Sequence, residues 1–500
     1  MRAESPGAAR VTVMPASRVL RWTTSAMDVL LVNPPPPPAQ RVSRGLMGGF
    51  GMVVGEGLCY PPLDLLHVAG ILERDGHRVR LIDAEATGTP CDSVLEQLGE
   101  PAPALVGLTT SSATLALDLA LADRIKQRLP RAIVFVTGSQ GSKVPDLAMH
   151  NSRIDAVVRG EPELTVAAMA SALQQGGDPL AAVGLSVRRG EQIVHNPDRP
   201  LLKGPELDAL PFPARHLLPV EPYRIPTMEG PIQTVASSRG CPINCTYCGY
   251  VVAQGIPWRG RSAASVLAEL RQIVEVHGVR NVVFRDPLFA GSRERTLELC
   301  ALLEEARLPL KWQCETAIKT LDEELLAAMA RAGCVSVSFG VESGNEELQK
   351  KYSRGKIKTH DHAKIVVDAA RRHGIATRAF FMLGFPEETP AQAAETIDLA
   401  VYLNPDTVQF TAVTPYPDTK LYKETRPERE DDFDYSKFSG TTPVGVARAM
   451  TDNQVSAHIR KAYRRFYMRP SRLLRELRRP QLLLQRARRY VGLVRAASEV

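Results

Sequence analysis

The sequence has few cysteines, no long apolar run and no internal repeat. Only 8 of its 500 residues are cysteine, which excludes a disulfide-rich secreted scaffold. No stretch reaches the ~20 uninterrupted apolar residues that a membrane-spanning helix requires. Residues 1–26 contain arginines but no compact apolar segment typical of a secretory signal. We therefore expect a cytoplasmic protein.

The sequence also shows no convincing Ser/His/Asp triad and no phosphate-binding glycine loop. The net charge of +7 is modest for 500 residues, and much of it comes from an arginine-rich tail after Arg460. This charge does not indicate nucleic-acid binding. Apolar residues make up 44% and charged residues 23%, the balance of a globular protein, and the length implies two or three domains.

The first part of the chain has the pattern of a doubly wound α/β domain. Residues 1–26 mix Ser, Pro, Gly, Ala and Arg without a period and are predicted to be a disordered lead-in. Over residues 27–197, short apolar runs alternate with helical periods, which predicts a flavodoxin-like parallel sheet. The predicted strands are 29–32, 79–82, 105–108, 133–136 and 156–158, with helices such as Leu63–Arg74 and 113–129 between them.

The loops at the carboxyl ends of these strands are the candidate binding loops of the first domain. In open parallel sheets, ligands bind beyond the carboxyl ends, near the switch in strand order. The candidate contacts there are Asn33, Thr110, Ser111, Gly138, Ser139, Gln140, Gly160 and Glu161.

A proline-rich segment over 198–230 is predicted to link this domain to a second one. From 231 to 423, six apolar runs alternate with amphipathic helices, which predicts a partial (β/α)6 barrel with its active site at the carboxyl ends of the strands. Residues 424–500 are predicted to be helical and rich in arginine. We expect this region to cap the barrel, with peripheral contact to anionic lipid as the alternative.

Three cysteines, Cys241, Cys245 and Cys248, follow the first strand of the second domain at spacings of four and three. Thiolates favour zinc and iron–sulfur clusters. Structural zinc usually requires a fourth Cys or His, and the next candidates, His277 and Cys300, lie in separate helical segments. An iron–sulfur cubane held by three thiolates keeps one iron open for another ligand. The spacing therefore favours a cluster over zinc.

The segment Cys-x-x-x-Cys-x-x-Cys, with Tyr247 before the last cysteine, resembles the signature of the radical S-adenosylmethionine enzymes. The resemblance implies that Cys241, Cys245 and Cys248 bind a 4Fe-4S cluster and act in catalysis. In that family the open iron chelates S-adenosylmethionine, and one electron cleaves it to methionine and a 5'-deoxyadenosyl radical. The radical then removes a hydrogen atom from the substrate.

Other segments at the strand ends resemble the family's cofactor-contacting segments. Asp286, after the second barrel strand, resembles the position that meets the methionine end of the cofactor. Glu342 and Ser343, after the fourth strand, resemble the ribose or carboxylate segment. Gly384 and Glu388, after the fifth strand, resemble the segment near the adenine.

Some of these residues allow a second interpretation. Asp286 is also a favoured helix N-cap residue. Arg259 and Arg261 either pair with a carboxylate in the site or lie exposed. Cys314 and Cys334 are expected to be buried small residues rather than ligands.

An α/β domain before such a barrel resembles the cobalamin-binding subfamily, through segments such as 31–35, 60–63, 77–83 and 158–161. The Asp-x-His-x-x-Gly pattern of a histidine-ligated cobalamin is absent, so a protein histidine on cobalt is not predicted. The alternative is that this domain has lost cobalamin and packs on the barrel.

The leading hypothesis is a cobalamin-dependent radical methyltransferase acting on an unactivated carbon of a small metabolite. The resemblance implies a small-molecule substrate and an external electron donor of the flavodoxin or ferredoxin type, with no nucleic acid. A radical cyclase, oxidase or rearranging enzyme, similar to those that form rings on tetrapyrroles, is the alternative within the subfamily. A non-catalytic cluster protein in electron transfer or regulation is the alternative from another class.

Overall fold

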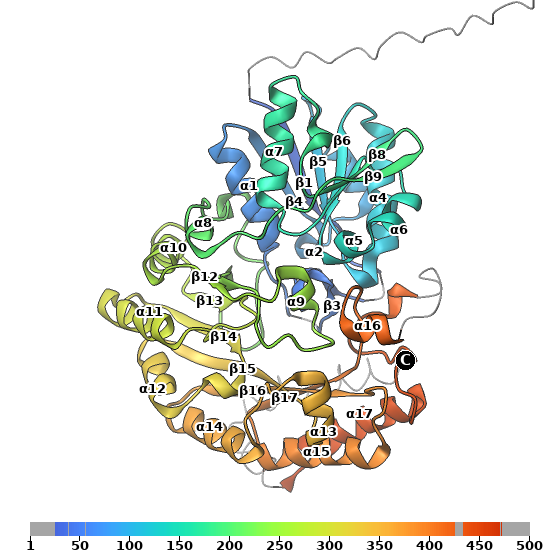
Figure 1. The fold of residues 1–500 in the computed structure, drawn as a ribbon. Helices are drawn as coiled ribbons and strands as arrows, with labels where there is room; N and C mark the ends of the chain where they lie inside the picture. Colours follow the sequence, from blue (N-terminus) through green and yellow to red (C-terminus); the bar gives the residue numbers. More distant parts are fainter. Residues whose placement is uncertain (1–25, 39, 56, 426–433, 471, 473–500) are drawn as a thin grey trace, which may run out of the picture.

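The computed structural model describes residues 26–38, 40–55, 57–425, 434–470 and 472. The predicted disordered lead-in and most of the predicted basic tail lie outside these ranges. Two α/β units stack on each other, with the segments around β3 (Met52–Val53) and α9 (Gly249–Gln254) between them (Figure 1). Among the described helices, none combines the length and apolar character needed to cross a bilayer.

The first unit contains a seven-stranded sheet with strand order β4-β1-β5-β6-β7-β8-β9. Its first five strands in chain order are parallel and follow the 2-1-3-4-5 order of flavodoxin-like folds, as predicted. The sequence prediction missed the antiparallel hairpin β8–β9 at the edge. The strands are β1 (Asp28–Asn33), β4 (Arg78–Asp83), β5 (Leu105–Thr109), β6 (Ile133–Thr137), β7 (Ala156–Val158), β8 (Leu185–Arg189) and β9 (Gln192–His195).

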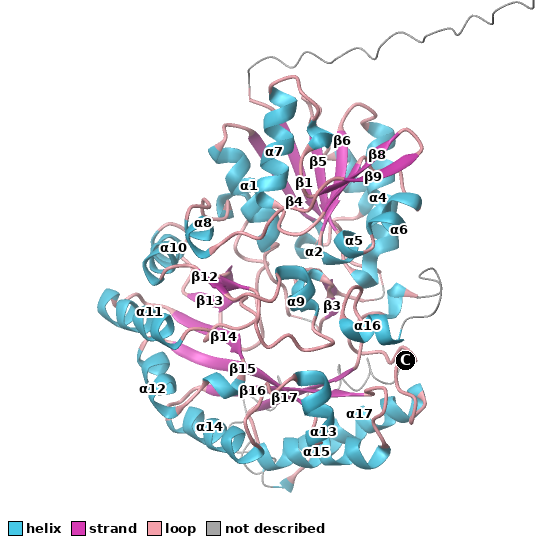
Figure 2. Ribbon diagram, in the orientation of Figure 1, coloured by secondary structure: helices cyan, strands magenta, loops and turns pink. Residues whose placement is uncertain are grey.

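Strand β1 shows why the central strands are continuously apolar. Val29 and Leu31 pack into the core on one face, and Leu30 and Val32 pack into the core on the other. Both faces are covered by helices, as Figure 2 shows, so residues 29–32 are apolar on both sides of the strand. The helices are α1 (Leu63–Arg74), α2 (Ala84–Thr87), α3 (Cys91–Glu96), α4 (Leu115–Arg128), α5 (Ser139–Lys143), α6 (Pro145–His150) and α7 (Glu163–Gln174).

The second unit is the predicted partial barrel, with six parallel strands that neighbour one another in chain order. Helices cover its outer face in Figure 1. The strands are β10 (Ile232–Val235), β13 (Asn281–Phe284), β14 (Lys311–Thr316), β15 (Cys334–Glu342), β16 (Ala376–Leu383) and β17 (Thr407–Ala412). The covering helices are α10 (Ala263–Glu275), α11 (Arg293–Ala306), α12 (Glu323–Arg331), α14 (His360–Arg372), α15 (Pro390–Leu403) and α17 (Asp452–Tyr467).

The barrel strands have two different faces. On β14, Trp312 and Cys314 are buried in the core that the helices share, while Gln313 and Glu315 are half-buried on the opposite face. The same alternation continues along β15, β16 and β17. We call this second, partly open face the inner face of the barrel. Cys314 and Cys334 are buried, as predicted.

Helix α17 covers the open edge of the barrel at β17. The Tyr463 hydroxyl accepts a hydrogen bond from the Phe410 amide at 3.1 Å, and the Tyr467 hydroxyl accepts one from the Val408 amide at 3.2 Å. These contacts satisfy edge groups that would otherwise be unpaired. The predicted cap over the barrel is confirmed for this helix, but most of residues 434–451 is irregular rather than helical.

The remaining elements are short. The connecting segment 198–230 contains α8 (Gly204–Asp208) and a 3-10 turn at Arg215–Leu217, so it is more ordered than a plain linker. The other short elements are β2 (Val42–Ser43), β11 (Ser238–Arg239), β12 (Arg259–Gly260), α13 (Glu346–Leu348) and α16 (Lys420–Thr425), with a π-helical turn at Gln349–Ser353.

Candidate functional site

The three cysteines lie on the loop between β11 and α9. The loop begins at Gly240, whose φ is +79° and whose Cβ, if present, would lie 2.0 Å from the Pro257 carbonyl oxygen. Glycine is therefore required there. Further along, the Thr246 amide donates to the Tyr352 carbonyl at 2.9 Å. The close packing at Gly240 and the hydrogen bond at Thr246 therefore fix the loop at its start and near its end.

The thiols form a buried donor set. Cys241 and Cys245 are buried and Cys248 is half-buried. Burial raises the pKa of Cys245 and of Cys248 to about 11, and the nearby Lys356 ammonium opposes this rise. Among the described residues, no three His, Cys, Asp or Glu side chains converge on a single ion. A cubane distributes its thiolates over separate irons, so this donor set fits a 4Fe-4S cluster better than zinc.

Half-buried Lys356 and buried Glu342 form an ion pair beside the cysteines, with 2.6 Å between Nζ and Oε1. Burial would lower the pKa of Lys356, but Glu342, Cys245 and Cys248 together raise it above its ordinary value. The cation therefore stays charged next to the thiols. Sequence reasoning identified Glu342 and missed Lys356, which lies 14 residues further along the chain in a lysine-rich stretch that looks solvent-exposed.

The predicted Gly384 segment lies next to the cysteine loop through an aromatic stack. The Phe385 ring is 4.7 Å from Tyr352 and 6.0 Å from Tyr247, measured between centroids. Gly384 has a φ of +93°, and its amide donates to Glu388 Oε2 at 2.5 Å. Burial raises the pKa of Glu388 to about 7, although the backbone amides lower it.

Ser343 and Asp286 are buried and already accept hydrogen bonds from other residues of the barrel unit. The Ser343 hydroxyl accepts from the Asn345 amide at 3.1 Å. Asp286 Oδ1 accepts from the hydroxyls of Ser237 and Ser238 at 2.9 and 2.6 Å, and Oδ2 has no hydrogen-bond partner among the described atoms. The alternative N-cap interpretation of Asp286 is wrong, because Ser292 caps α11.

A cleft of about 850 Å³ lies between the carboxyl ends of the first sheet's strands and the barrel. The first unit contributes Asn33 and Thr109, at the ends of β1 and β5, where the strand order switches. The barrel contributes Arg285, after β13, and Tyr250 and Gln254 on α9, directly after Cys248. The cleft therefore joins the predicted cobalamin loops to the cysteine loop.

Several predicted cobalamin loop residues are brought together behind this cleft. Thr110 donates from its hydroxyl to the Thr137 carbonyl at 2.9 Å, and Gln140 accepts from the Ser112 hydroxyl at 2.6 Å. The Gln140 amide nitrogen is buried without a partner among the described atoms. A Cβ on Gly138 would lie 2.3 Å from the Thr110 carbonyl, so these two strand-end loops touch.

Other predicted contacts are already engaged by neighbouring side chains. The Asn33 amide donates to Asp83 at 2.7 Å, the Ser111 hydroxyl lies 2.7 Å from that of Thr114, and the Ser139 hydroxyl donates to the Gly48 carbonyl. The Gly160 amide donates to Ser142 at 3.0 Å.

A glycine-rich wedge over residues 48–51, which the sequence reasoning did not single out, lies between the two units. Cβ atoms on Gly48, Gly49 and Gly51 would lie within 3 Å of Tyr250, Ser139 and Ser111 respectively. Bare backbone is needed for this close approach. The cluster of three glycines in four residues was the available signal.

Glu161, a predicted cobalamin contact, instead pairs with barrel arginines. Its Oε1 lies 2.8 Å from Arg259 and 3.2 Å from Arg239, and the neighbouring Glu163 pairs with Arg239 at 2.6 Å. Arg259 and Arg261 are both buried and paired, so the exposed alternative is wrong. These contacts join the units immediately before Cys241 and do not favour a cofactor contact for Glu161.

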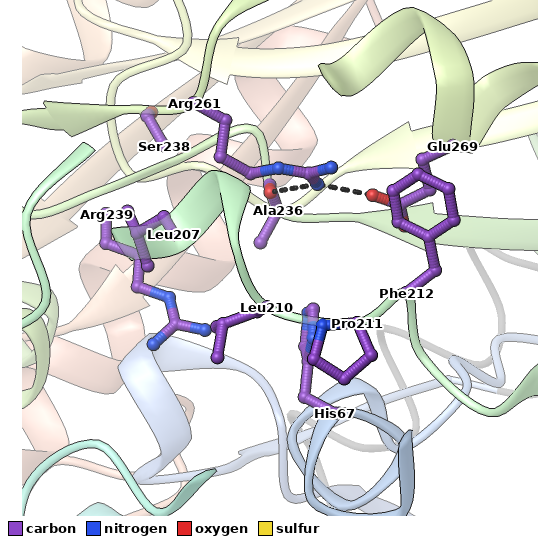
Figure 3. Close-up of a pocket in the computed structure, with 10 residues that line it drawn as sticks. All are labelled: His67, Leu207, Leu210, Pro211, Phe212, Ala236, Ser238, Arg239, Arg261 and Glu269. Carbon is purple, nitrogen blue, oxygen red and sulfur yellow. Dashed lines mark hydrogen bonds and ion pairs between the residues drawn. The ribbon is translucent and has the colours of Figure 1, made fainter. Parts of the chain in front are cut away.

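A second, smaller pocket of about 300 Å³ lies between α1, the connecting segment and the start of the barrel. Figure 3 shows His67 on one side and the Arg261–Glu269 pair on the other. Burial lowers the pKa of His67 to about 4, and both ring nitrogens lack partners among the described atoms. The pocket is separate from the cysteine loop.

Comparison with known families agrees with both units. The model described as "Radical SAM superfamily" matches residues 235–400, and the model described as "B12 binding domain" matches residues 52–170. The first range contains the cysteine loop, and the second contains the loops that follow β5, β6 and β7.

Individual relatives cover nearly the whole chain. An uncharacterized methyltransferase of Pyrococcus horikoshii is 30% identical over 90% of this chain and 95% of its own length. An anaerobic magnesium-protoporphyrin IX monomethyl ester cyclase of Rubrivivax gelatinosus is 27% identical over 82% of this chain and 74% of its own. The fold is similar to that of the radical S-adenosylmethionine methyltransferase TsrM from Kitasatospora setae, with a TM-score of 0.63, 21% identity, and coverage of 80% of this chain and 74% of that one.

Proposed function

Since this chain belongs to the cobalamin-binding radical S-adenosylmethionine enzymes, we propose that it methylates an unactivated carbon of a small metabolite. When bound, the cluster and S-adenosylmethionine supply a radical that removes hydrogen, and cobalamin supplies the methyl group. The chain's own residues then have to hold these groups close together and keep water out.

The observation that carries the proposal is the cleft that both units line. Parallel sheets bind ligands at the carboxyl ends of their strands, and here two such ends face the same space. Helix α9 begins one residue after Cys248 and contributes Tyr250 and Gln254 to the cleft wall. A group in the first unit's loops and a cluster on Cys241, Cys245 and Cys248 would therefore share one substrate space.

We assign Lys356 to the cofactor's carboxylate. Its ammonium is held beside the thiols by Glu342, so it offers positive charge where a cluster-bound amino acid would present its carboxylate. Glu342 in turn can accept from ribose hydroxyl groups with its second oxygen. Asp286 Oδ2 and the Gly384 turn remain candidates for the amino and adenine ends.

The enzyme acts on a small molecule and needs a reductant. We propose an external flavodoxin or ferredoxin as the electron donor, because the described residues contain no second cysteine group for another cluster.

The experiment is anaerobic reconstitution with iron, sulfide and hydroxocobalamin, followed by reduction and addition of S-adenosylmethionine. Mass spectrometry then measures 5'-deoxyadenosine and S-adenosylhomocysteine. We expect both products and bound cobalamin from the natural protein. The triple Cys241, Cys245 and Cys248 to Ala variant should lose deoxyadenosine, whereas Cys91→Ala, on α3 in the first unit, should not.

The alternatives give different products. Deoxyadenosine without S-adenosylhomocysteine favours a ring-forming, oxidising or rearranging enzyme. If cluster-loaded, reduced protein forms neither product even when cell metabolites are added, the result favours a non-catalytic cluster protein and contradicts the proposal.

A further inference from the structure

Opposite charges lie in one row on the inner face of the barrel. In the strand register, Glu315 on β14 is opposite Ser338 on β15, and Ser338 is opposite Arg378 on β16. The three side chains alternate with residues buried in the helix-covered core, so they share the inner face. Ser338, between the strands of the carboxylate and the guanidinium, has the shortest of the three side chains.

The Glu315 carboxylate has no ion-pair or hydrogen-bond partner among the described residues, although it is half-buried. Burial raises its pKa, and the guanidinium groups of Arg285 and Arg378 and the ammonium of Lys356 oppose the rise from a distance. A cationic group delivered by a ligand would give this carboxylate the close, charge-assisted partner that it lacks.

Arg378 is held in place at the other end of the row. Its guanidinium donates to Gln409 Oε1 and lies 5.2 Å from the centroid of the Phe380 ring. A guanidinium has five N–H donors, so these contacts orient the group and leave donors for a carboxylate. Phe380 also gives the inner face an apolar surface next to the charge.

We propose that this row binds the substrate, and that the substrate is a free α-amino acid whose ammonium group pairs with Glu315 and whose carboxylate pairs with Arg378. The two opposite charges support this choice. Glu315 and Arg378 lie two strands apart, so their backbones are about 10 Å apart. The carboxylate accepts from an ammonium group and the guanidinium donates to a carboxylate, and a free α-amino acid carries both groups.

The row also lies where the substrate of the proposed function must lie. Glu315 is within electrostatic range of Lys356, beside the cysteine loop, and of Arg285, which lines the cleft between the units. A molecule on this row would therefore reach both cofactor regions. Gln313, Ser336 and Gln409 add further polar side chains to the same face, which suits a charged, polar ligand.

This inference rests on the proposed function, but it is tested by binding rather than turnover. Holoenzyme with saturating S-adenosylmethionine is dialysed anaerobically to equilibrium against an equimolar mixture of all proteinogenic amino acids except methionine. Methionine is omitted because it is a cleavage product. Mass spectrometry measures which amino acids are retained, and a second dialysis uses their N-acetyl and methyl ester derivatives.

We expect retention of one or a few amino acids, with at least a tenfold loss in Glu315→Gln and in Arg378→Gln. Exposed residues on the outer helices give the matched controls, Glu305→Gln and Arg271→Gln, which should retain the ligand as the natural protein does. Glu315→Gln keeps the side-chain shape, and cluster and cobalamin absorption report whether each variant is loaded.

Three results overturn the inference: no amino acid is retained, the derivatives are retained equally well, or retention is unchanged in both variants. Deoxyadenosine and S-adenosylhomocysteine are measured on the same preparation. If those products form while no amino acid binds, the proposed function stands and the substrate assignment fails.

Discussion

The Lys356 ammonium nitrogen lies 2.6 Å from Glu342 Oε1, and both side chains face the thiols of the cysteine loop. Glu342 ends strand β15 with a φ of +72°, a conformation that non-glycine residues rarely adopt. The chain accepts this strain in order to aim the carboxylate back at the lysine, where a Cβ on Gly340 would lie 1.9 Å from Glu342 Oε1. The absence of a side chain at Gly340 therefore leaves the room that the Glu342–Lys356 ion pair needs.

Lys356→Met should weaken S-adenosylmethionine binding while leaving the cluster in place. Loss of one charge-assisted hydrogen bond costs about 1.5–3 kcal/mol, which corresponds to a roughly tenfold to hundredfold weaker affinity. Anaerobic calorimetric titration of the cluster-loaded protein, with the cluster left unreduced so that S-adenosylmethionine is not cleaved, measures the affinity, and iron analysis measures the cluster. The exposed Lys351→Met is the control. Unchanged affinity in Lys356→Met would contradict the assignment.

Glu163→Gln should destabilise the contact between the two units. Glu163 pairs with Arg239 at 2.6 Å with a side chain only 2% exposed, so the variant leaves the buried guanidinium with only the 3.2 Å contact to Glu161, which Arg259 shares. We expect a loss of about 3 kcal/mol, read from the midpoint of urea unfolding. Glu304→Gln removes an exposed pair with Arg331 and should cost under about 1 kcal/mol. Equal effects in the two variants would refute a buried interdomain pair.

Glu388 should make stability fall as the pH rises. Its folded-state pKa is about 7, above the ordinary 4.5, because of burial. Between these values the unfolded chain ionises while the folded one stays protonated, which favours unfolding. The natural protein should therefore lose about 3 kcal/mol between pH 4 and pH 8 relative to Glu388→Gln. Parallel unfolding curves of the two proteins at both pH values would show that Glu388 is not perturbed.

Gly138→Ala should reduce cobalamin retention. A Cβ there would lie 2.3 Å from the Thr110 carbonyl, so two predicted cobalamin loops would have to separate. Gly176→Ala is a matched control, since Gly176, after α7, also has a positive φ of +72° but has open space around it. We expect substoichiometric cobalt after gel filtration of Gly138→Ala and near-normal cobalt for Gly176→Ala. Similar cobalt content in both variants would mean that these loops do not hold the cofactor.

Much of the fold could be predicted because buried parallel strands are apolar on both faces. The run at β1 and the runs of the barrel strands stand out for this reason. The hairpin β8–β9 was missed because it lies at an edge, where β9 is short and mostly exposed. Helix 113–129 was predicted in one piece, whereas a 3-10 turn at Ser112–Thr114 precedes α4.

The site could be predicted only where the ligands are local in sequence. The three cysteines lie within eight residues, so their spacing alone indicated a cluster. The role of Lys356 is visible only in the folded chain, where the lysine lies beside Glu342. Glu161 follows a strand and was therefore predicted to bind cobalamin, but in the structure it pairs with Arg239 and Arg259 of the second unit. Contacts between distant segments carry no periodic signal, and for that reason sequence patterns did not indicate them.

The central claim is that this chain transfers a methyl group by way of cobalamin, and one measurement tests it without knowledge of the substrate. Reconstituted protein is reduced anaerobically and given S-adenosylmethionine with a deuterated methyl group, and mass spectrometry follows cobalamin and S-adenosylhomocysteine. We predict deuteromethylated cobalamin and S-adenosylhomocysteine in equal amounts. Cobalamin that stays bound, is fully reduced and gains no label would contradict the account.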